Sequence, residues 1–227
     1  YNSTFTYPEG GAIEYVNALL HDLPKELLTF NTALTGLDLN KKIAHTSAGD
    51  IQYQKLITSV PLVHLLRMSG LAFDEASFSW NKVLVFNLGF DKKGPKNVHW
   101  MYFPQRDIRF YRVGFYDNIF DADRMSLYVE IGAQDGEALD VEKEKQTVLA
   151  DLQKAEIISG HQLVSWHTVT MNPAYVHINQ NAIEQWQKLR PQLEAHGVYS
   201  IGRYGDWTYC AIEDNIVQAR QLSDQIS

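Results

Sequence analysis

Apolar residues recur every three to four positions in five stretches of the chain, which is the spacing of one helix face. In the first stretch Ile13, Val16, Leu19 and Leu23 form the apolar stripe, and Pro24 ends the pattern. The spacing predicts helices over residues 12–23, 63–68, 141–155, 182–193 and 212–222.

Between these stretches lie short runs rich in β-branched and aromatic residues, which favour strands. Residues 47–50 form a turn that joins two runs as a hairpin, and the polar loop 104–107 joins an antiparallel pair. Pro61 and Pro173 are each expected to end a strand. The predicted strands cover residues 27–30, 35–39, 43–46, 51–53, 56–62, 80–90, 99–103, 109–115, 125–132, 163–171 and 198–201.

Because strands gather in the middle of the chain and helices occur throughout, we predict an α+β (mixed α/β) fold with a mainly antiparallel sheet. The 227 residues are 45% hydrophobic and 12% aromatic, which is enough for one large domain or two interleaved ones. The chain starts at Tyr1 rather than Met, so we expect it to be a piece of a longer protein.

Charge and cysteine content narrow the classes of partner. The net charge of −7 and the lack of a dense basic block argue against nucleic acid, although a few arginines could still bind an anionic ligand. No apolar run reaches membrane-span length. The single cysteine, Cys210, cannot form an intrachain disulfide, which suits a reducing, cytoplasmic location.

A glycine-rich turn near the C-terminus is the first candidate site. The apolar run 198–201 reads as a buried strand, which Gly202 and Gly205 interrupt before the last helix. Glycines at such a junction let a ligand approach the backbone, and Arg203 between them suits a phosphate or carboxylate. The alternative is a plain turn that carries a surface arginine.

The predicted pair of strands in the middle of the chain is the second candidate. Strand alternation would place Arg109 and Tyr111 on one face and Arg112 on the other. Arginines among aromatics suggest a cleft in which rings stack and guanidinium groups meet phosphates. The alternative is cation–π pairing on an exposed sheet face. The substrate-binding candidates are Trp100, Tyr102, Arg109, Tyr111 and Arg112.

Other kinds of site lack support in the sequence. The eight histidines show no metal-ligand grouping, so we expect no metal site. There is no G-x-S-x-G elbow, no P-loop and no G-x-G-x-x-G dinucleotide motif.

Several segments together resemble the flavin-dependent amine oxidase superfamily, and within it the UDP-galactopyranose mutases and related lipopolysaccharide-biosynthesis flavoproteins. Four segments, spread in order over nearly the whole chain, carry the resemblance, and the last is the most specific. They are Tyr7-Pro8-Glu9-Gly10-Gly11, Ile57-Thr58-Ser59-Val60-Pro61-Leu62, His99-Trp100-Met101-Tyr102-Phe103-Pro104 with Phe110-Tyr111-Arg112-Val113, and Gly202-Arg203-Tyr204-Gly205-Asp206-Trp207-Thr208-Tyr209.

The resemblance implies a cofactor and roles for individual residues. Arg203 and Tyr209 would be catalytic, beside the flavin and the substrate diphosphate, and Gly202, Gly205 and Trp207 would join Arg203 in contacting FAD. Residues 1–60 and 198–227 would belong to an FAD-binding domain, and residues 61–197 to a substrate-binding domain. Because the dinucleotide motif is absent, this chain alone should bind FAD poorly.

The resemblance therefore implies part of an FAD-dependent oxidoreductase or isomerase that acts on a nucleotide sugar in surface polysaccharide biosynthesis. This chain alone would be inactive, and it could form a homodimer through strand edges. Two alternatives stay open. One is a binding module for nucleotide sugars or glycans without chemistry, and the other is an oxidase of the protoporphyrinogen or amine type.

Overall fold

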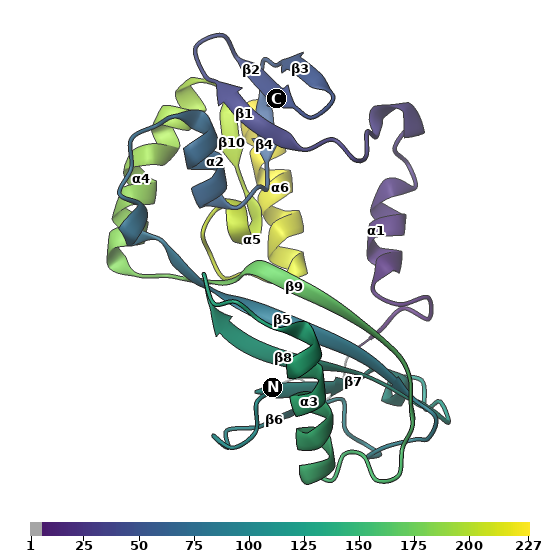
Figure 1. Ribbon diagram of the computed structural model, residues 1–227. Coiled ribbons are helices and arrows are strands. Elements are labelled where there is room, and N and C mark those ends of the chain that lie inside the picture. Colours follow the sequence, from purple (N-terminus) through teal and green to yellow (C-terminus); the bar gives the residue numbers. More distant parts are fainter. Residues whose placement is uncertain (1–5) are drawn as a thin grey trace.

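A five-stranded antiparallel sheet occupies the lower part of the molecule in the view of Figure 1. This computed structural model describes residues 6–227, so residues 1–5 of the predicted segment 1–60 lie outside the described residues. The strand order is β6-β7-β8-β5-β9. The strands are β5 (Ser79–Phe90), β6 (Trp100–Tyr102), β7 (Arg112–Phe115), β8 (Met125–Gln134) and β9 (Leu163–His177).

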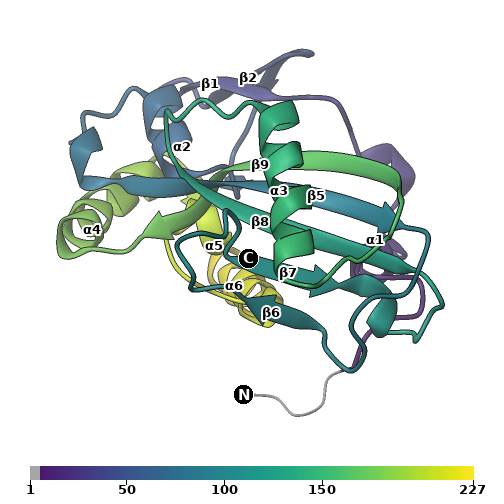
Figure 2. The same cartoon turned by 60° about the horizontal axis from the view of Figure 1, so that its bottom comes forward.

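One face of this sheet is covered by helix α3 (Val141–Lys154), which crosses the strands in Figure 2. Val148 and Leu152 of the helix are fully buried against apolar side chains of the strands. In β8 the apolar residues Leu127, Val129 and Ile131 alternate with polar ones, which is why one face can be buried while the other stays open.

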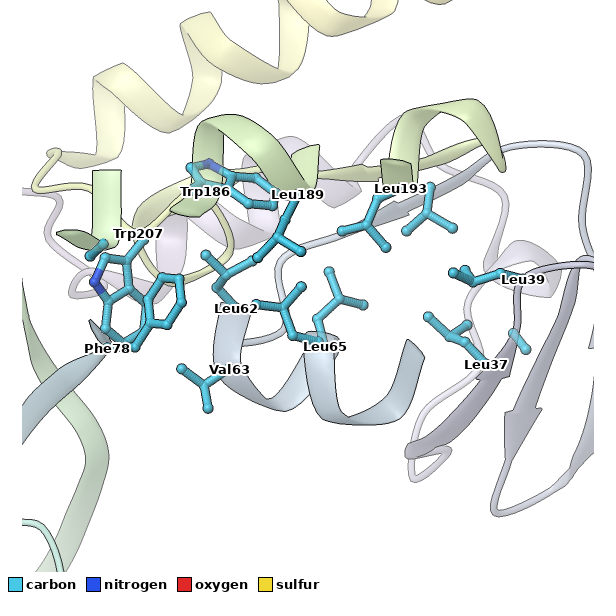
Figure 3. Packing of buried hydrophobic residues seen from close by; sticks show 14 of the residues in the cluster. Leu37, Leu39, Leu62, Val63, Leu65, Phe78, Trp186, Leu189, Leu193 and Trp207 are labelled. Atoms are coloured by element: carbon cyan, nitrogen blue, oxygen red, sulfur yellow. The ribbon is translucent and has the colours of Figure 1, made fainter. Parts of the chain in front are cut away.

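A second core lies above the sheet and is shown in Figure 3. It is formed by helices α2 (Leu62–Ser69) and α4 (Gln180–Ala195) against two small sheets. One is the meander β1 (Leu34–Asp38), β2 (Ile43–Thr46) and β3 (Gly49–Gln52), and the other is the parallel pair β4 (Leu56–Thr58) and β10 (Val198–Ser200).

The remaining elements are helices α1 (Ile13–Leu20), α5 (Gly202–Gly205) and α6 (Ile212–Ile226), and the 3₁₀ turns η1 (Lys25–Leu27), η2 (Glu75–Ser77) and η3 (Tyr116–Asn118). The apolar stripes of α1 and α6 are largely uncovered within residues 6–227. Ile13 is 56% exposed and Ile212 is 60% exposed, whereas Leu222 of α6 is buried.

The mixed α/β fold class is confirmed, together with the hairpin β2–β3 and the antiparallel pair β6–β7. Two strand predictions are wrong. Residues 27–30 form the end of η1 and an exposed extended segment, because this short apolar run has no neighbouring strand. Strand β9 also continues past Pro173, which lies on an edge strand where the register with β5 shifts, so its missing N–H disrupts no regular pairing.

The core packing joins segments that the predicted domain division separates. Leu62–Leu66 of α2 and Ala182–Leu193 of α4 fall within the predicted range 61–197, yet they pack with β1 and β10. The boundaries at residues 60 and 197 themselves stay a prediction. Among the described residues, none of the helices combines the length and the apolar character needed to cross a membrane.

Candidate functional site

The guanidinium group of Arg203 lies between two tyrosine rings, where α5 approaches the end of β9. Its Cζ is 5.3 Å from the ring centre of Tyr175 and 4.4 Å from that of Tyr209, so both rings make cation–π contacts. One N–H donates to the Cys210 carbonyl at 3.3 Å, and no other hydrogen bond of this guanidinium is formed within residues 6–227. The remaining N–H donors can therefore bind an acceptor from outside.

The two predicted glycines pack α5 closely against its neighbours. Gly202 is buried with φ +83°, and an added Cβ would lie 3.2 Å from Asn215 Oδ1. A Cβ on Gly205 would lie 2.9 Å from Ser200 Oγ. The amide of Gly202 donates to Gln218 at 2.7 Å, so helix α6 already satisfies the N–H group that the sequence suggested for a ligand.

Trp207 is placed in the core. It is 5% exposed, its ring packs edge-on against Phe78 and Trp80, and its Nε1 donates to the His177 carbonyl at 3.3 Å. The residue therefore ties the Arg203 turn to strands β5 and β9. Tyr209, in contrast, is 72% exposed and is accessible to a ligand.

A second group of predicted residues lies on the face of the five-stranded sheet opposite α3, which we call the open face. The register aligns Tyr102, Arg112 and Glu130 across three strands, and Trp100, Gly114 and Tyr128 in the next row. A Cβ on Gly114 would lie 2.0 Å from the Tyr128 ring, so the glycine leaves room for that ring to lie flat on the sheet. Trp100 and Tyr102 are exposed beside it.

Glu130 holds the polar centre of the open face together. Its carboxylate forms an ion pair with Arg112 at 2.5 Å and accepts a hydrogen bond from the Tyr111 hydroxyl. Arg112 also donates to the Tyr102 hydroxyl at 3.4 Å. The Glu130 side chain is almost fully buried, so this negative charge balances Arg112 away from solvent.

The environment shifts the titration of this group. Burial, followed by the hydrogen bond to Glu130, raises the pKa of Tyr111 well above its usual value, and the nearby Tyr175 adds to the shift. Burial alone would lower the pKa of Arg112, but the hydrogen bonds to Glu130 and Tyr102 outweigh this effect and raise the pKa above its usual value. Burial also raises the pKa of Tyr128. Arg112 therefore stays charged, and Tyr111 and Tyr128 stay neutral, at physiological pH.

The structure does not bring Arg109 to the open face. Its guanidinium forms a bidentate pair with Glu144 of α3 at 2.9 and 3.0 Å, on the covered side of the sheet. Arg109 and Arg112 lie on opposite sides of the sheet, as expected, but the alternation fails at Phe110 and Tyr111 because β7 begins only at Arg112, after a loop that buries Phe110. Tyr111 and Arg112 consequently both reach Glu130.

Sequence reasoning missed Glu130, Tyr128 and Tyr175. Glu130 and Tyr128 occupy polar positions that alternate with apolar ones in the predicted strand 125–132. This alternation could have indicated that both face away from the core. Tyr175 follows Pro173, where the strand was expected to end, so no local pattern indicated it. Among residues 6–227, no cluster of three or more His, Cys, Asp or Glu side chains is arranged to hold a metal ion.

Comparison with known proteins relates this geometry to solved structures. No protein-family model and no curated protein matches the sequence. The fold is similar to reduced UDP-galactopyranose mutase, with a TM-score of 0.79 and 25% identity over 89% of this chain and 48% of that one. It is also similar to a putative protoporphyrinogen oxidase from Exiguobacterium sp. 255-15, with a TM-score of 0.77 and 15% identity over 95% of this chain and 51% of that one.

A third similar structure is a conjugated-linoleic-acid-producing fatty acid isomerase from P. acnes, with a TM-score of 0.63 and 16% identity over 86% of this chain and 47% of that one. These three proteins have FAD-dependent amine oxidase-type folds, and the chain spans about half the length of each. The chain thus has part of that fold. The similarity to the oxidase and the fatty acid isomerase concerns the fold alone.

Proposed function

We propose that this chain is the substrate-binding part of an FAD-dependent oxidoreductase or isomerase that converts a nucleotide sugar, in the manner of a UDP-galactopyranose mutase. The observation that carries the proposal is the guanidinium of Arg203, which is held between Tyr175 and Tyr209 with N–H donors free for a ligand. The mutase is also, of the three structures described above, the one with the highest identity and TM-score.

The residues around Arg203 suit the isoalloxazine end of FAD. The exposed Tyr209 and the charged Arg203 offer a stacking surface and donors for carbonyl or phosphate oxygens. Gly202 and Trp207 would act through packing, because the first has its amide bonded to Gln218 and the second lies in the core. When bound, the flavin supplies the electrons or the nucleophile of the reaction.

The chain's own residues would position the substrate and balance its charge. Arg203 and Tyr209 would hold the diphosphate, and its developing charge would be stabilised there as the bond to the sugar breaks. The open face, with Tyr102, Arg112 and Trp100, would bind the uncharged part of the substrate. The polarity of this face supports a nucleotide sugar over the apolar substrate of an oxidase. A cytoplasmic role in surface polysaccharide biosynthesis is part of the same proposal.

The test uses the full-length protein that contains this chain. Purified protein should carry flavin absorbance and, after reduction, convert UDP-galactopyranose to the furanose form. We expect Arg203→Ala to lower turnover by about 100-fold, the range for removing one charge-stabilising donor. Arg203→Lys should retain part of it, and Arg220→Ala on exposed α6 is the matched control. Unchanged turnover in Arg203→Ala would exclude the proposed role of this residue.

Two results would favour the alternatives. Yellow protein that oxidises an amine or a porphyrinogen but leaves UDP-galactopyranose unchanged would indicate the oxidase type. Colourless full-length protein that still binds UDP-galactose would indicate a binding module without chemistry.

A further inference from the structure

A small uncharged pocket lies on the open face, at the opposite end from Arg203. It has a volume of about 230 Å³ and is reached between the ends of β5, β8 and β9. Asn81 of β5 pairs with Tyr175 and Asn87 pairs with His167. At about 3.3 Å per strand residue, these six positions place the pocket roughly 20 Å from the tyrosine that contacts Arg203.

The pocket lining combines polar and apolar groups and carries no Asp, Glu, Lys or Arg. Ser126, Ser165, Asn87 and His167 contribute polar side chains, and Tyr116 contributes a ring. The Tyr116 hydroxyl donates to Asn87 Oδ1 at 3.2 Å, which orients the amide. Within residues 6–227, the side chains of Ser126, Ser165 and His167 form no hydrogen bond, so these groups can bond to a ligand.

Gly89 gives the pocket its depth. It pairs with Ser126 on one side and Ser165 on the other, and an added Cβ would lie 2.6 Å from Ser165 Oγ. A side chain at this position would therefore displace the Ser165 hydroxyl or occupy the floor of the pocket. The ring of Tyr116 stands beside it, 5.1 Å from the ring of Tyr128, and continues the aromatic surface of the open face.

We propose that this pocket, formed by Asn87, Gly89, Tyr116, Ser126, Ser165 and His167, binds an uncharged, hydroxyl-rich ring. Hydroxyl groups match the donors and acceptors of serine, asparagine and histidine, and the Tyr116 ring provides apolar area for one face of the ring. The volume is below the roughly 300–1,000 Å³ of sites for whole drug-sized ligands, so it suits a single ring. The lack of lining charge favours an uncharged ring over the phosphates, which need positive charge to balance them.

The inference deepens the proposed function, because the pocket lies on the same open face. It rests on the proposed function only for the identity of the molecule that carries the ring. A hexose and the ribose of a nucleoside offer the same chemistry. The experiment therefore uses both, with galactose and uridine as separate probes of the full-length protein. Binding is measured by calorimetry or ligand-observed NMR.

We expect at least one probe to bind, and Ser165→Ala and His167→Ala to weaken its binding about tenfold each, as expected for one lost hydrogen bond. Gly89→Ala should weaken it as well. Thr170→Ala is the matched control, because Thr170 lies on the same strand but faces the other side of the sheet. The affinity of this variant for the probe should equal that of the wild type. Preference for galactose or for uridine identifies the source of the ring.

The pocket assignment would be overturned if neither probe binds. It would also be overturned if Ser165→Ala, His167→Ala and Gly89→Ala bind the probe as tightly as the wild type does. Turnover of UDP-galactopyranose, measured on the same proteins, separates the two proposals. If the protein turns over UDP-galactopyranose but the pocket variants do not change probe binding, the pocket assignment is contradicted and the proposed reaction stands. Probe binding that the variants weaken, without turnover, contradicts the proposed reaction but supports the pocket.

Discussion

The carboxylate of Glu130 and the guanidinium of Arg112 form an ion pair 2.5 Å apart on an otherwise open sheet face. Three neighbouring tyrosine rings, those of Tyr102, Tyr111 and Tyr128, lie within 6 Å of the same guanidinium. The guanidinium of Arg112 is therefore occupied by the buried Glu130 carboxylate and the surrounding tyrosine rings. It is less available to a phosphate than the guanidinium of Arg203 is.

Glu130→Gln should be strongly destabilising, because it leaves the charge of Arg112 without its partner while preserving the shape of the side chain. We expect a loss of about 3 kcal/mol in the free energy of unfolding, as for breaking a largely buried pair. Urea unfolding measures the change. Glu137→Gln is the control, since Glu137 is more exposed and lies 3.7 Å from Arg109. Equal effects of the two substitutions would contradict a special role for Glu130.

The raised pKa of Tyr111 predicts a loss of stability at alkaline pH. The unfolded state releases the tyrosine proton near pH 10, whereas the folded state retains it, so the unfolded state binds fewer protons and stability falls as pH rises above about 10. Below that pH this contribution is fully present. In Tyr111→Phe the fall in melting temperature above about pH 10 should be shallower than in the wild type. An identical slope in both proteins would contradict the assignment.

Gly114→Ala tests the close contact between strand β7 and Tyr128. The added methyl group cannot coexist with the ring in its present position, so the ring must leave the sheet surface. We expect a loss of about 1–3 kcal/mol, the usual cost of overpacking, together with weaker ligand binding on the open face. Gly36→Ala in β1 is the control, because its Cβ would meet its nearest neighbour at an ordinary 3.5 Å.

Trp207 and Trp100 should respond oppositely to truncation. Trp207→Ala removes a core ring and should cost about 3–5 kcal/mol in stability. Trp100 is half exposed, so Trp100→Ala should change stability by less than about 1 kcal/mol while weakening substrate binding. Thermal unfolding and substrate titration of both variants provide the comparison. A stable Trp207→Ala variant would argue against its role in the core.

We expect this chain, when isolated, to form dimers. Strands β4 and β10 form a parallel sheet of only two strands, with no further strand paired to it within residues 6–227. The exposed stripe of α1 adds apolar surface. Light scattering over a range of concentrations tests this expectation. A monomer at every concentration would contradict it.

The sequence by itself determined the elements in which one periodicity dominates. Strands β5 and β8 and helix α3 follow from alternation and helical spacing, because burial of one face imposes those patterns locally. The same reasoning found Arg112 and Arg203 as charged residues in unusual surroundings.

Only the tertiary structure decided which side chains meet. Alternation in the sequence separates Arg109 from Arg112, but only the structure shows that Arg109 pairs with Glu144 of α3, whereas Arg112 pairs with Glu130. Glu130 and Tyr175 reach the site through pairing between distant segments. Such pairing depends on register and on the edge position of β9, which no local pattern encodes.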